Sequence, residues 1–342
     1  MTDKKTKIGI LSAGGDCPGI NAAIRGVGKT AIVQYGMEVI GISNGFSGLI
    51  DRDYEPLTED KLSGILTLGG TILGTSRMKP FKPQEGDTVE DKPQVIIENY
   101  ELLGLDALVC IGGNGTQKTA NLLSKEGLNV VGIPKTIDND VWGTDVTFGF
   151  DSAVNIATDA IDRLHTTANS HKRVMVIEVM GHNAGWIALH SGLAAGGDVI
   201  LLPEMEYDMD VVAQTLLTRA EKGKPYSIVV VGEGIGTPGK KNAARYISKE
   251  IMDRTGLETR ETILGYIQRG GSPSPADRIL ATRYGAYAAS LIHEKKFGTM
   301  VSIKGGEITS VPLEEVGGKT RLIEPGNHLV EKAVNMGVCF GK

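Results

Sequence analysis

The sequence predicts an α/β fold made of two Rossmann-like three-layer α/β/α domains with mostly parallel sheets. Short apolar runs, typical of buried parallel strands, alternate with helical patterns along almost the whole chain. Several of these runs end directly in glycine-rich turns, as strands that lead into helices do in α/β folds. The length of 342 residues exceeds the roughly 250–300 residues at which one hydrophobic core stops growing, so we expect two domains.

In the first half of the chain, apolar runs and helical patterns follow one another in order. The apolar runs predict strands at residues 8–11, 37–42, 107–111 and 129–133. Helical patterns begin near Asn21 and cover residues 93–103 and 117–125, and a polar, exposed segment is expected at 79–92. This order predicts one parallel sheet with right-handed crossovers.

A second set of strand and helix patterns follows a change of composition near Gly149. It predicts helices at residues 152–168, from 183 and at 276–294, and strands at 173–181, 199–203, 227–234 and 299–303. The last strand is expected to return to the first domain, and the C-terminal segment to pack as a helix on the second. We therefore expect one domain from residues 1–149 plus about 268–316 and another from 150–267 plus about 317–342.

Composition narrows the class of protein. The net charge of -5, with both signs mixed, argues against a nucleic-acid or membrane partner, because either would favour a basic stripe. Glycine, at 46 of 342 residues or about 13% against a typical ~7%, is expected in turns that approach small ligands. The 3 cysteines lack metal-ligand spacing, and no signal peptide or run of ~18 apolar residues is present. We expect a cytoplasmic protein with a small ligand.

The turn at residues 134–140 is the first candidate for chemistry. It follows the expected strand at 129–133, which places Asp138 and Asp140 where α/β sheets bind ligands. Two carboxylates in different environments can divide labour, one beside a metal and the other accepting a proton. The structural alternative is an Asx-rich turn that caps the next helix.

Two glycine turns, at residues 13–19 and 112–116, open helices after neighbouring strands. Glycines let backbone N–H groups approach an anion, and the helix directs its positive end at the same point. The loop at 68–77 adds hydroxyl groups and ends in Arg77, which suits phosphate oxygens, and Phe46 is expected to face a nucleotide base. A glycine turn alone is more often explained by strand-to-helix geometry, but two glycine turns and the aspartate turn at successive strand ends favour a phosphoryl-transfer site.

Five segments together are similar to the 6-phosphofructokinase family. They are residues 14–16, 112–116, 134–140, 180–181 and 265–271, and the likeness covers about residues 7 to 320. The resemblance implies ATP and fructose 6-phosphate as substrates, Mg²⁺ as cofactor, and a homotetramer in which two substrate-binding arginines come from a neighbouring subunit. Glycolysis in the cytoplasm is the implied setting.

The resemblance also implies roles for single residues. Asp138 is the implied general base that takes the proton from the sugar 1-hydroxyl, while the Gly15 N–H, Arg77 and Thr136 stabilise charge on the transferred group. The implied nucleotide contacts are Gly14, Gly15, Phe46, Arg77, Asn114, Gly115 and Thr116. The implied magnesium ligands are Asn114 and Asp140. Implied sugar-phosphate contacts are Thr136, Asp138, Asp140, Arg173, Met180, Gly181, His182, Glu233, Arg260, Tyr266 and Arg269.

Four positions depart from the pattern that the resemblance implies. Asn114 stands where the family commonly has an acidic magnesium ligand, which predicts a weaker metal site. His182 replaces an arginine that helps the transition state, and Tyr266 replaces a histidine beside the 6-phosphate. The implied effector site is partly present, with Arg25, Lys29, Lys222 and Lys224 matching and His165 in place of an arginine, so allosteric control stays open.

Two positions bear on the phosphoryl donor. Gly115 leaves room for the α-phosphate of a nucleotide, whereas pyrophosphate-dependent members have an aspartate there. Lys135 is pyrophosphate-like, but a flexible lysine can swing aside, so ATP is favoured. A pyrophosphate-dependent enzyme, a noncatalytic regulatory subunit and an NAD-kinase-like enzyme remain the alternatives.

Overall fold

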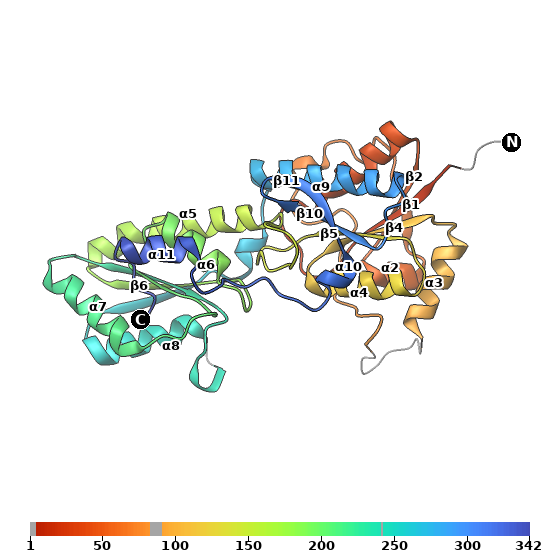
Figure 1. Ribbon diagram of the computed structural model, residues 1–342. Helices are drawn as coiled ribbons and strands as arrows, with labels where there is room; N and C mark the ends of the chain where they lie inside the picture. Colours follow the sequence, from red (N-terminus) through yellow and green to blue (C-terminus); the bar gives the residue numbers. More distant parts are fainter. Residues whose placement is uncertain (1–4, 83–90, 241) are drawn as a thin grey trace. The chain divides into compact units, whose positions relative to one another are not determined.

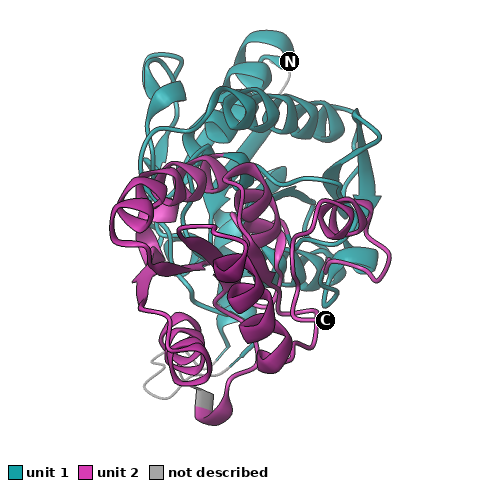
Figure 2. Ribbon diagram, turned by 90° about the vertical axis from the view of Figure 1, so that its left-hand side faces the viewer, with its two compact units in different colours: residues 1–136, 140–151, 269–320 teal, residues 137–139, 152–268, 321–342 magenta. Residues whose placement is uncertain are grey.

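The computed structural model describes residues 5–82, 91–240 and 242–342, so part of the polar segment expected at 79–92 lies outside the described residues. The chain forms two compact units, coloured separately in Figure 2. Unit 1 comprises Met1–Thr136, Asp140–Asp151 and Arg269–Thr320, and unit 2 comprises Ile137–Asn139, Ser152–Gln268 and Arg321–Lys342. Among the described helices, none has the length and apolar character needed to cross a membrane.

The sheet of unit 1 has the strand order β11-β10-β5-β4-β1-β2-β3 (Figure 1). The strands are β1 (Lys7–Ser12), β2 (Glu38–Ile42), β3 (Tyr54–Pro56), β4 (Ala107–Gly112), β5 (Val130–Pro134), β10 (Thr299–Lys304) and β11 (Glu307–Pro312). β3 and β11 pair antiparallel with their neighbours at the two edges, and the pairs between them are parallel. Every residue of β4 is buried, as expected for a central strand covered on both faces.

Helices cover both faces of this sheet (Figure 1). They are α1 (Ile20–Lys29) with the π-helix Thr30–Gln34, α2 (Phe46–Asp51), α3 (Lys92–Leu102), α4 (Asn114–Lys125), α9 (Pro275–His293), α10 (Leu313–Val316) and the 3₁₀ turn Ile65–Thr67. One face carries α2, α3, α4 and α10, whose apolar side chains join the strands in one core. α1 packs on α9 at Gly26 and Gly285, where an added Cβ would lie 2.7 Å and 2.4 Å from backbone oxygens, so both positions need glycine.

The sheet of unit 2 is parallel, in the order β7-β8-β6-β9. Its strands are β6 (Val174–Val179), β7 (Val199–Leu201), β8 (Ser227–Gly232) and β9 (Thr259–Ile263). Its helices are α5 (Phe150–His171), which begins in unit 1, α6 (Trp186–Ala194), α7 (Met209–Glu221), α8 (Ala243–Thr255) and α11 (His328–Asn335), with 3₁₀ turns at Pro238–Lys240 and Gly265–Arg269. α7 and α8 share a core with the strands, whereas α11 contacts α6 (Figure 1).

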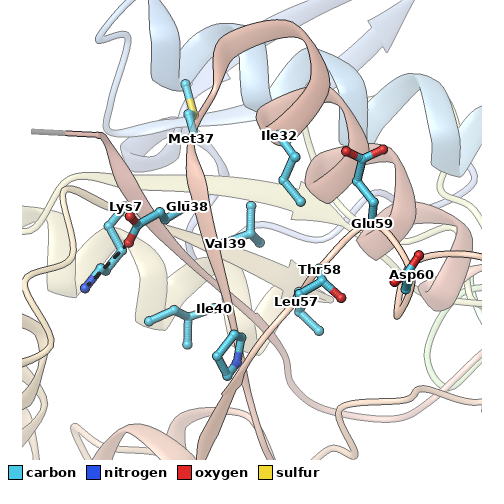
Figure 3. A pocket seen from close by; sticks show the side chains of 11 residues that line it. Lys7, Ile32, Met37, Glu38, Val39, Ile40, Leu57, Thr58, Glu59 and Asp60 are labelled. Carbon is cyan, nitrogen blue, oxygen red and sulfur yellow. Dashed lines mark ion pairs between the residues drawn. The ribbon is translucent and has the colours of Figure 1, made fainter. Parts of the chain in front are cut away.

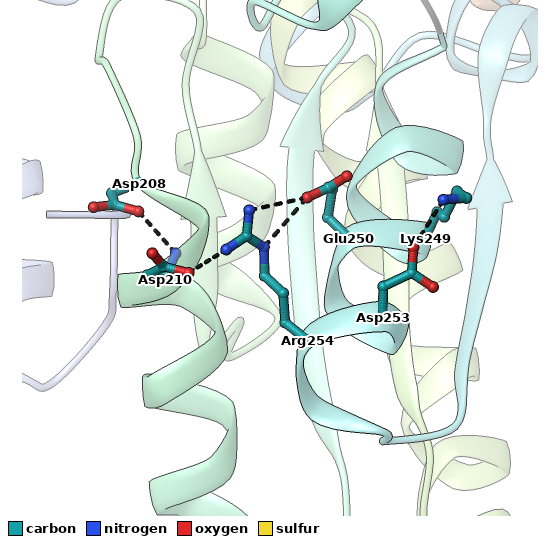
Figure 4. Close-up of polar contacts among 6 residues, drawn as sticks. All are labelled: Asp208, Asp210, Lys249, Glu250, Asp253 and Arg254. Atoms are coloured by element: carbon teal, nitrogen blue, oxygen red, sulfur yellow. Dashed lines mark hydrogen bonds and ion pairs between the residues drawn. The ribbon is translucent and has the colours of Figure 1, made fainter.

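An ion-pair cluster joins α7 to α8 on the surface of unit 2 (Figure 4). Arg254 contacts Asp210 of α7 and lies 3.2 Å from Glu250 one turn earlier on α8. The Asp208 carboxylate caps α7 by accepting a 2.8 Å hydrogen bond from the Asp210 N–H. Because exposed ion pairs contribute little to stability, the apolar core rather than this cluster holds the two helices together.

Candidate active site

The three predicted turns follow adjacent strands of the unit 1 sheet. β5, β4 and β1 are neighbours in the sheet and run parallel, so their carboxyl ends lie at one edge. The loop from Ala13, the start of α4 at Asn114 and the turn from Lys135 leave these three ends. This is the position at which ligands bind in open α/β sheets.

Hydrogen bonds from two other segments hold the loop after β1. The Gly14 N–H donates to the Ser76 carbonyl at 2.9 Å, and the Thr75 hydroxyl donates to the Gly14 carbonyl at 2.7 Å. The Thr116 hydroxyl, 6% exposed, donates to the Ala13 carbonyl at 3.2 Å. Thr75 and Thr116 thus hold the loop in place, and Arg77 follows directly as an exposed side chain. The sequence predicted that the hydroxyl groups of the loop at 68–77 suit phosphate oxygens, whereas the Thr75 hydroxyl donates to a loop carbonyl.

Lys135 has a structural position that differs from the expectation of a flexible donor-binding lysine. Its side chain is 2% exposed, and Nζ donates to the Gly15 carbonyl and, at 3.1 Å, to the Ala13 carbonyl. The interpretation that this lysine can swing aside is therefore wrong. Its ammonium group instead fixes two carbonyls of the loop after β1, because a buried ammonium group requires hydrogen-bond acceptors.

Asn114 and Asp140 lie together in unit 1. Nδ2 of Asn114 donates to the Asp140 carboxylate at 2.8 Å and to the Asp140 carbonyl at 3.1 Å. Because both partners are acceptors, the amide oxygen Oδ1 must point the other way. That oxygen is buried and has no hydrogen-bond partner among the described residues.

This pair fits a magnesium ion with few protein ligands. The Asp140 carboxylate and the unpartnered Asn114 Oδ1 are two hard oxygen donors that would face a common ion once the Asn114 amide turns away from the carboxylate, and Mg²⁺ commonly completes its shell with water and phosphate oxygens. Over residues 5–82, 91–240 and 242–342, no group of three or more His, Cys, Asp or Glu side chains is placed to hold a metal. The donor set therefore suits an ion that arrives with a phosphate ligand.

Gly115, the second residue of α4, is exposed. A Cβ added there meets no heavy atom within 4 Å. The start of α4 directs backbone N–H groups outward, with Gly113 before it in an extended conformation. The space beside Gly115 is thus open to a ligand phosphate.

Arg269 lies against Gly15 within unit 1. A Cβ added to Gly15 would overlap the Arg269 guanidinium, which is the end of a flexible side chain and can shift. The structure therefore places Arg269 beside the phosphate-loop candidate. The Thr136 carbonyl, in the same unit, accepts a 2.8 Å hydrogen bond from the Thr147 hydroxyl, which holds the entry to the aspartate turn.

Phe46 does not present an aromatic face. Its side chain is 2% exposed and belongs to the core formed by α2, α3, α4 and the strands. The expectation that Phe46 stacks on a nucleotide base is wrong in this structure. The Gly45 turn before α2 directs the ring inward, where burial of its apolar surface is favourable.

In unit 2, the predicted sugar contacts follow the carboxyl ends of β6 and β8. The His182 N–H donates to the Glu233 carboxylate at 2.8 Å, which joins the two turns. His182 has a left-handed backbone, with φ of 52°, and its side chain is exposed. The Met180 N–H donates to Gln268 Oε1 at 3.2 Å. Gly181, between Met180 and His182, has φ of 142°. These backbone and carboxylate groups lie beyond the carboxyl ends of the strands.

Arg173 and Arg260 lie near the amino ends of the strands in the same sheet, opposite the carboxyl ends that carry Met180 and Glu233. Arg173 precedes β6, and Arg260 pairs with Met175 near the start of that strand. Both guanidinium groups contact Glu258, at 2.7 Å and 2.8 Å, and the hydrogen bond from Arg173 lowers the pKa of that carboxyl group. Since β6 is six residues long, these arginines stand roughly 20 Å from the turn at Met180. The structure does not bring them together with Glu233 in one chain.

The last predicted contact, Tyr266, is 73% exposed on the 3₁₀ turn Gly265–Arg269. His165, expected at an effector site, is engaged within unit 2. Its Nε2 lies 2.7 Å from the Ala195 carbonyl, which can only accept, so Nδ1 accepts from the Tyr226 hydroxyl at 3.0 Å. His165 is thus a structural link between α5 and the Tyr226 segment.

A pocket of about 780 Å³ in unit 1 does not coincide with the candidate site (Figure 3). Its lining includes Lys7 and Glu38, at the amino ends of β1 and β2. The predicted turns follow the carboxyl ends of the strands, and none of their residues lines this pocket. The candidate site therefore rests on position in the fold and not on this pocket.

Comparisons with known proteins identify the family of the chain. Residues 7–292 match the family model described as Phosphofructokinase. The chain is 63% identical to "ATP-dependent 6-phosphofructokinase 3" of Bacteroides thetaiotaomicron, over 98% of this chain and 100% of the relative. It is 54% identical to "ATP-dependent 6-phosphofructokinase" of Spirochaeta thermophila, over 97% of each. The phosphofructokinase structure from Saccharomyces cerevisiae superposes with a TM-score of 0.83 at 30% identity, over 98% of this chain and 47% of that one. The chain therefore belongs to the phosphofructokinase family.

Proposed function

We propose that this chain is an ATP-dependent 6-phosphofructokinase, a phosphotransferase with an alcohol acceptor. It transfers the terminal phosphoryl group of ATP to the 1-hydroxyl of fructose 6-phosphate, which yields fructose 1,6-bisphosphate and ADP in glycolysis. The observation that carries the proposal is the full-length identity of 63% to a relative with that name. The cytoplasm is the compartment that this reaction implies.

Unit 1 supplies the groups that hold the nucleotide. Gly14 and Gly15 present backbone N–H groups from a loop whose carbonyls are held by Lys135 and Thr75. Arg77 and Thr136 add positive charge and a hydroxyl, which stabilise charge on the transferred phosphoryl group. The start of α4, with Gly115 and Thr116, leaves room for the inner phosphates. Residues 1–149 plus about 268–316 form the nucleotide-binding domain in this proposal.

Asn114 Oδ1 and the Asp140 carboxylate are the proposed magnesium ligands in unit 1. Mg²⁺, when bound, neutralises charge on the phosphate oxygens. Without the ion, Asn114 Nδ2 donates to the Asp140 carboxylate at 2.8 Å, so a turn of the Asn114 amide would be needed to present both oxygens to the ion.

Unit 2 supplies the proton acceptor and the sugar contacts. Asp138 takes the proton of the 1-hydroxyl as its oxygen bonds to phosphorus and the bond to ADP breaks. Met180, Gly181, His182 and Glu233 contact the sugar from one edge of the unit 2 sheet. Residues 150–267 plus about 317–342 form the sugar-phosphate-binding domain in this proposal, and unit 2 adds Asp138 from the segment Ile137–Asn139.

The 6-phosphate is held by Arg173, Arg260 and Arg269, with Tyr266 beside it. Arg173 and Arg260 stand at the amino ends of β6 and β9, away from Glu233. This placement supports a homotetramer in which these two arginines serve the active site of a neighbouring subunit. Sedimentation analysis at working concentrations tests the oligomer, and a monomer with full activity would contradict it.

One coupled assay tests the reaction. The purified chain is given fructose 6-phosphate and magnesium with either ATP or pyrophosphate. Turnover with ATP and none with pyrophosphate is expected. Turnover with pyrophosphate alone contradicts the donor, and turnover with neither contradicts the enzyme function and favours a regulatory binding subunit.

The role of Asp138 has its own test. Asp138→Ser removes the carboxylate while keeping a small polar side chain. We expect kcat to fall by about 10²–10⁴ with little change in substrate binding, because the loss affects proton transfer in the transition state. A near-normal kcat would contradict the general-base role.

A further inference from the structure

A segment near the C-terminus contacts the aspartate turn. Within unit 2, Arg321 Nη1 donates to the Asn139 carbonyl at 3.0 Å, and the Ile323 N–H donates to Glu204 at 3.0 Å. Glu204 also accepts from the Gly185 N–H, at 2.9 Å, at the start of α6. Arg321 lies beyond residue 292, where the match to the family model ends. The backbone after Arg321 is therefore anchored, which fixes the point from which this side chain extends.

Trp186 holds the Arg321 side chain in place. The guanidinium lies over the indole, 4.1 Å from the ring centroid, and the indole N–H donates to the Arg321 carbonyl at 3.0 Å. Trp186 is 6% exposed, so the indole is itself fixed by packing. A planar guanidinium stacked on a ring and tied at its backbone has few alternative rotamers.

Asn139 is the residue between the two aspartates. It is 4% exposed and adopts a left-handed conformation, with φ of 53°, which asparagine tolerates better than most other residues with a Cβ. Contacts with neighbouring residues stabilise this conformation further. The bond from Arg321 to the Asn139 carbonyl is one such contact, and it fixes the backbone directly after Asp138.

We propose that Arg321 is a positioning residue for Asp138. By holding the Asn139 carbonyl, it keeps the Asp138 carboxylate in the orientation in which it accepts the proton of the phosphoryl acceptor. This inference rests on the proposed function, and Arg321 itself touches neither substrate nor the reacting atoms.

Two substitutions separate positioning from packing. Arg321→Met keeps an unbranched stem over Trp186 but removes every donor, and Arg321→Lys keeps the charge without the planar fork. Lys319→Met is the matched control, because Lys319 also stacks on an indole, that of Trp142, at 5.8 Å, two residues earlier in the chain. Thermal unfolding of each variant shows whether the fold is intact.

The expected result is a split between kcat and KM. In Arg321→Met, kcat falls roughly 10- to 100-fold, since small misplacements of a catalytic group cost that much. KM for ATP stays within about twofold, because the unit 1 contacts are intact. Arg321→Lys recovers part of the lost rate, and Lys319→Met has the wild-type rate. If Arg321→Met does not fold, the kcat of Arg321→Lys decides, and a wild-type value there overturns the proposal.

A double-mutant cycle tests whether Arg321 acts through Asp138. In an Asp138→Ser background, Arg321→Met should no longer change the residual rate. If Arg321→Met lowers the rate by the same factor in the Asp138→Ser background as in the wild-type chain, the inference is overturned. Trp186 emission, measured in a Trp142→Phe background, should change in Arg321→Met and so report the removal of the guanidinium.

The failures of the two proposals are distinguishable. A wild-type rate in Arg321→Met beside an inactive Asp138→Ser overturns the positioning role alone. Absence of turnover by the wild-type chain with fructose 6-phosphate and either donor overturns the proposed function and this inference together.

Discussion

The amide nitrogen of Asn114 donates to the carboxylate of Asp140 at 2.8 Å. A second bond, to the Asp140 carbonyl at 3.1 Å, also joins the start of α4 to the turn after β5, so residues that follow two neighbouring strands are linked directly. An aspartate at 114 would instead face Asp140 with like charge. Asparagine therefore stabilises the metal-free site and lowers the electrostatic attraction for a cation.

Asn114→Asp should strengthen magnesium dependence. We expect the metal-free variant to lose about 1–2 kcal/mol of unfolding free energy, because a hydrogen bond is replaced by repulsion. The apparent Kd for Mg²⁺ in the activity assay should fall several-fold, because the ion then neutralises two carboxylates. Asn121→Asp, on the same helix, is the control, and an unchanged magnesium requirement in Asn114→Asp would count against the metal role.

Lys135→Met should destabilise the loop after β1. The substitution leaves the Gly15 carbonyl without its ammonium donor and removes one of the two donors to Ala13, for a loss of about 1–3 kcal/mol of unfolding free energy. Urea denaturation measures the loss. The exposed Lys118→Met serves as control. The rate with ATP should fall without any gain with pyrophosphate, and a normal ATP rate would show that the loop keeps its shape without Lys135.

Gly115→Asp should impair the use of ATP without unfolding the chain. An added side chain meets open space, so Gly115→Ala should fold and keep its rate within about threefold. The aspartate places negative charge beside the inner phosphates, and kcat/KM for ATP should fall at least about tenfold. Parallel assays with ATP and pyrophosphate measure the donor preference. Equal losses of kcat/KM for ATP in Gly115→Ala and Gly115→Asp would show that the size of the added side chain, and not its charge, impairs the use of ATP.

His190 on α6 should make stability depend on pH. Burial first, and then the charge of Arg321, lowers the pKa of His190 below its ordinary 6.5. At a pH between the lowered pKa of the folded chain and the ordinary 6.5 of the unfolded chain, the unfolded chain binds more protons. The free energy of unfolding therefore falls as the pH drops below 6.5 and is restored above it. Denaturation at about pH 7.5 and about pH 5.5, compared between wild type and His190→Gln, isolates this group. An identical loss in both proteins would exclude His190 as its source.

The strands that the sequence predicts well are those in the middle of the sheets. β4 and β8 are buried along their whole length, so each appears as a continuous apolar run. The edge strands β3 and β11 and the strand β9 were not predicted. β9 reads Thr-Arg-Glu-Thr-Ile with two charged side chains, and β11 is mostly half-exposed. A strand that packs on one face only carries a weaker apolar signal.

In the candidate site, too, some features were predicted from the sequence and others were not. The turns at Gly14, Asn114 and Asp138 were predicted together, because each directly follows a recognisable strand and carboxyl ends of parallel strands meet at one edge. Phe46 and Lys135 were misplaced. An aromatic residue in a turn and a lysine near a strand end are usually exposed, whereas packing buries both here.

The sequence by itself determined the α/β class, the order of the central strands along the chain and the polar residues that follow their ends, because these are properties of neighbouring residues. Only the tertiary structure decided that Lys135 holds a loop 120 residues away and that Arg321 reaches Asn139 across 182 residues. Such contacts depend on which segments the folded core brings together, and no local pattern specifies them.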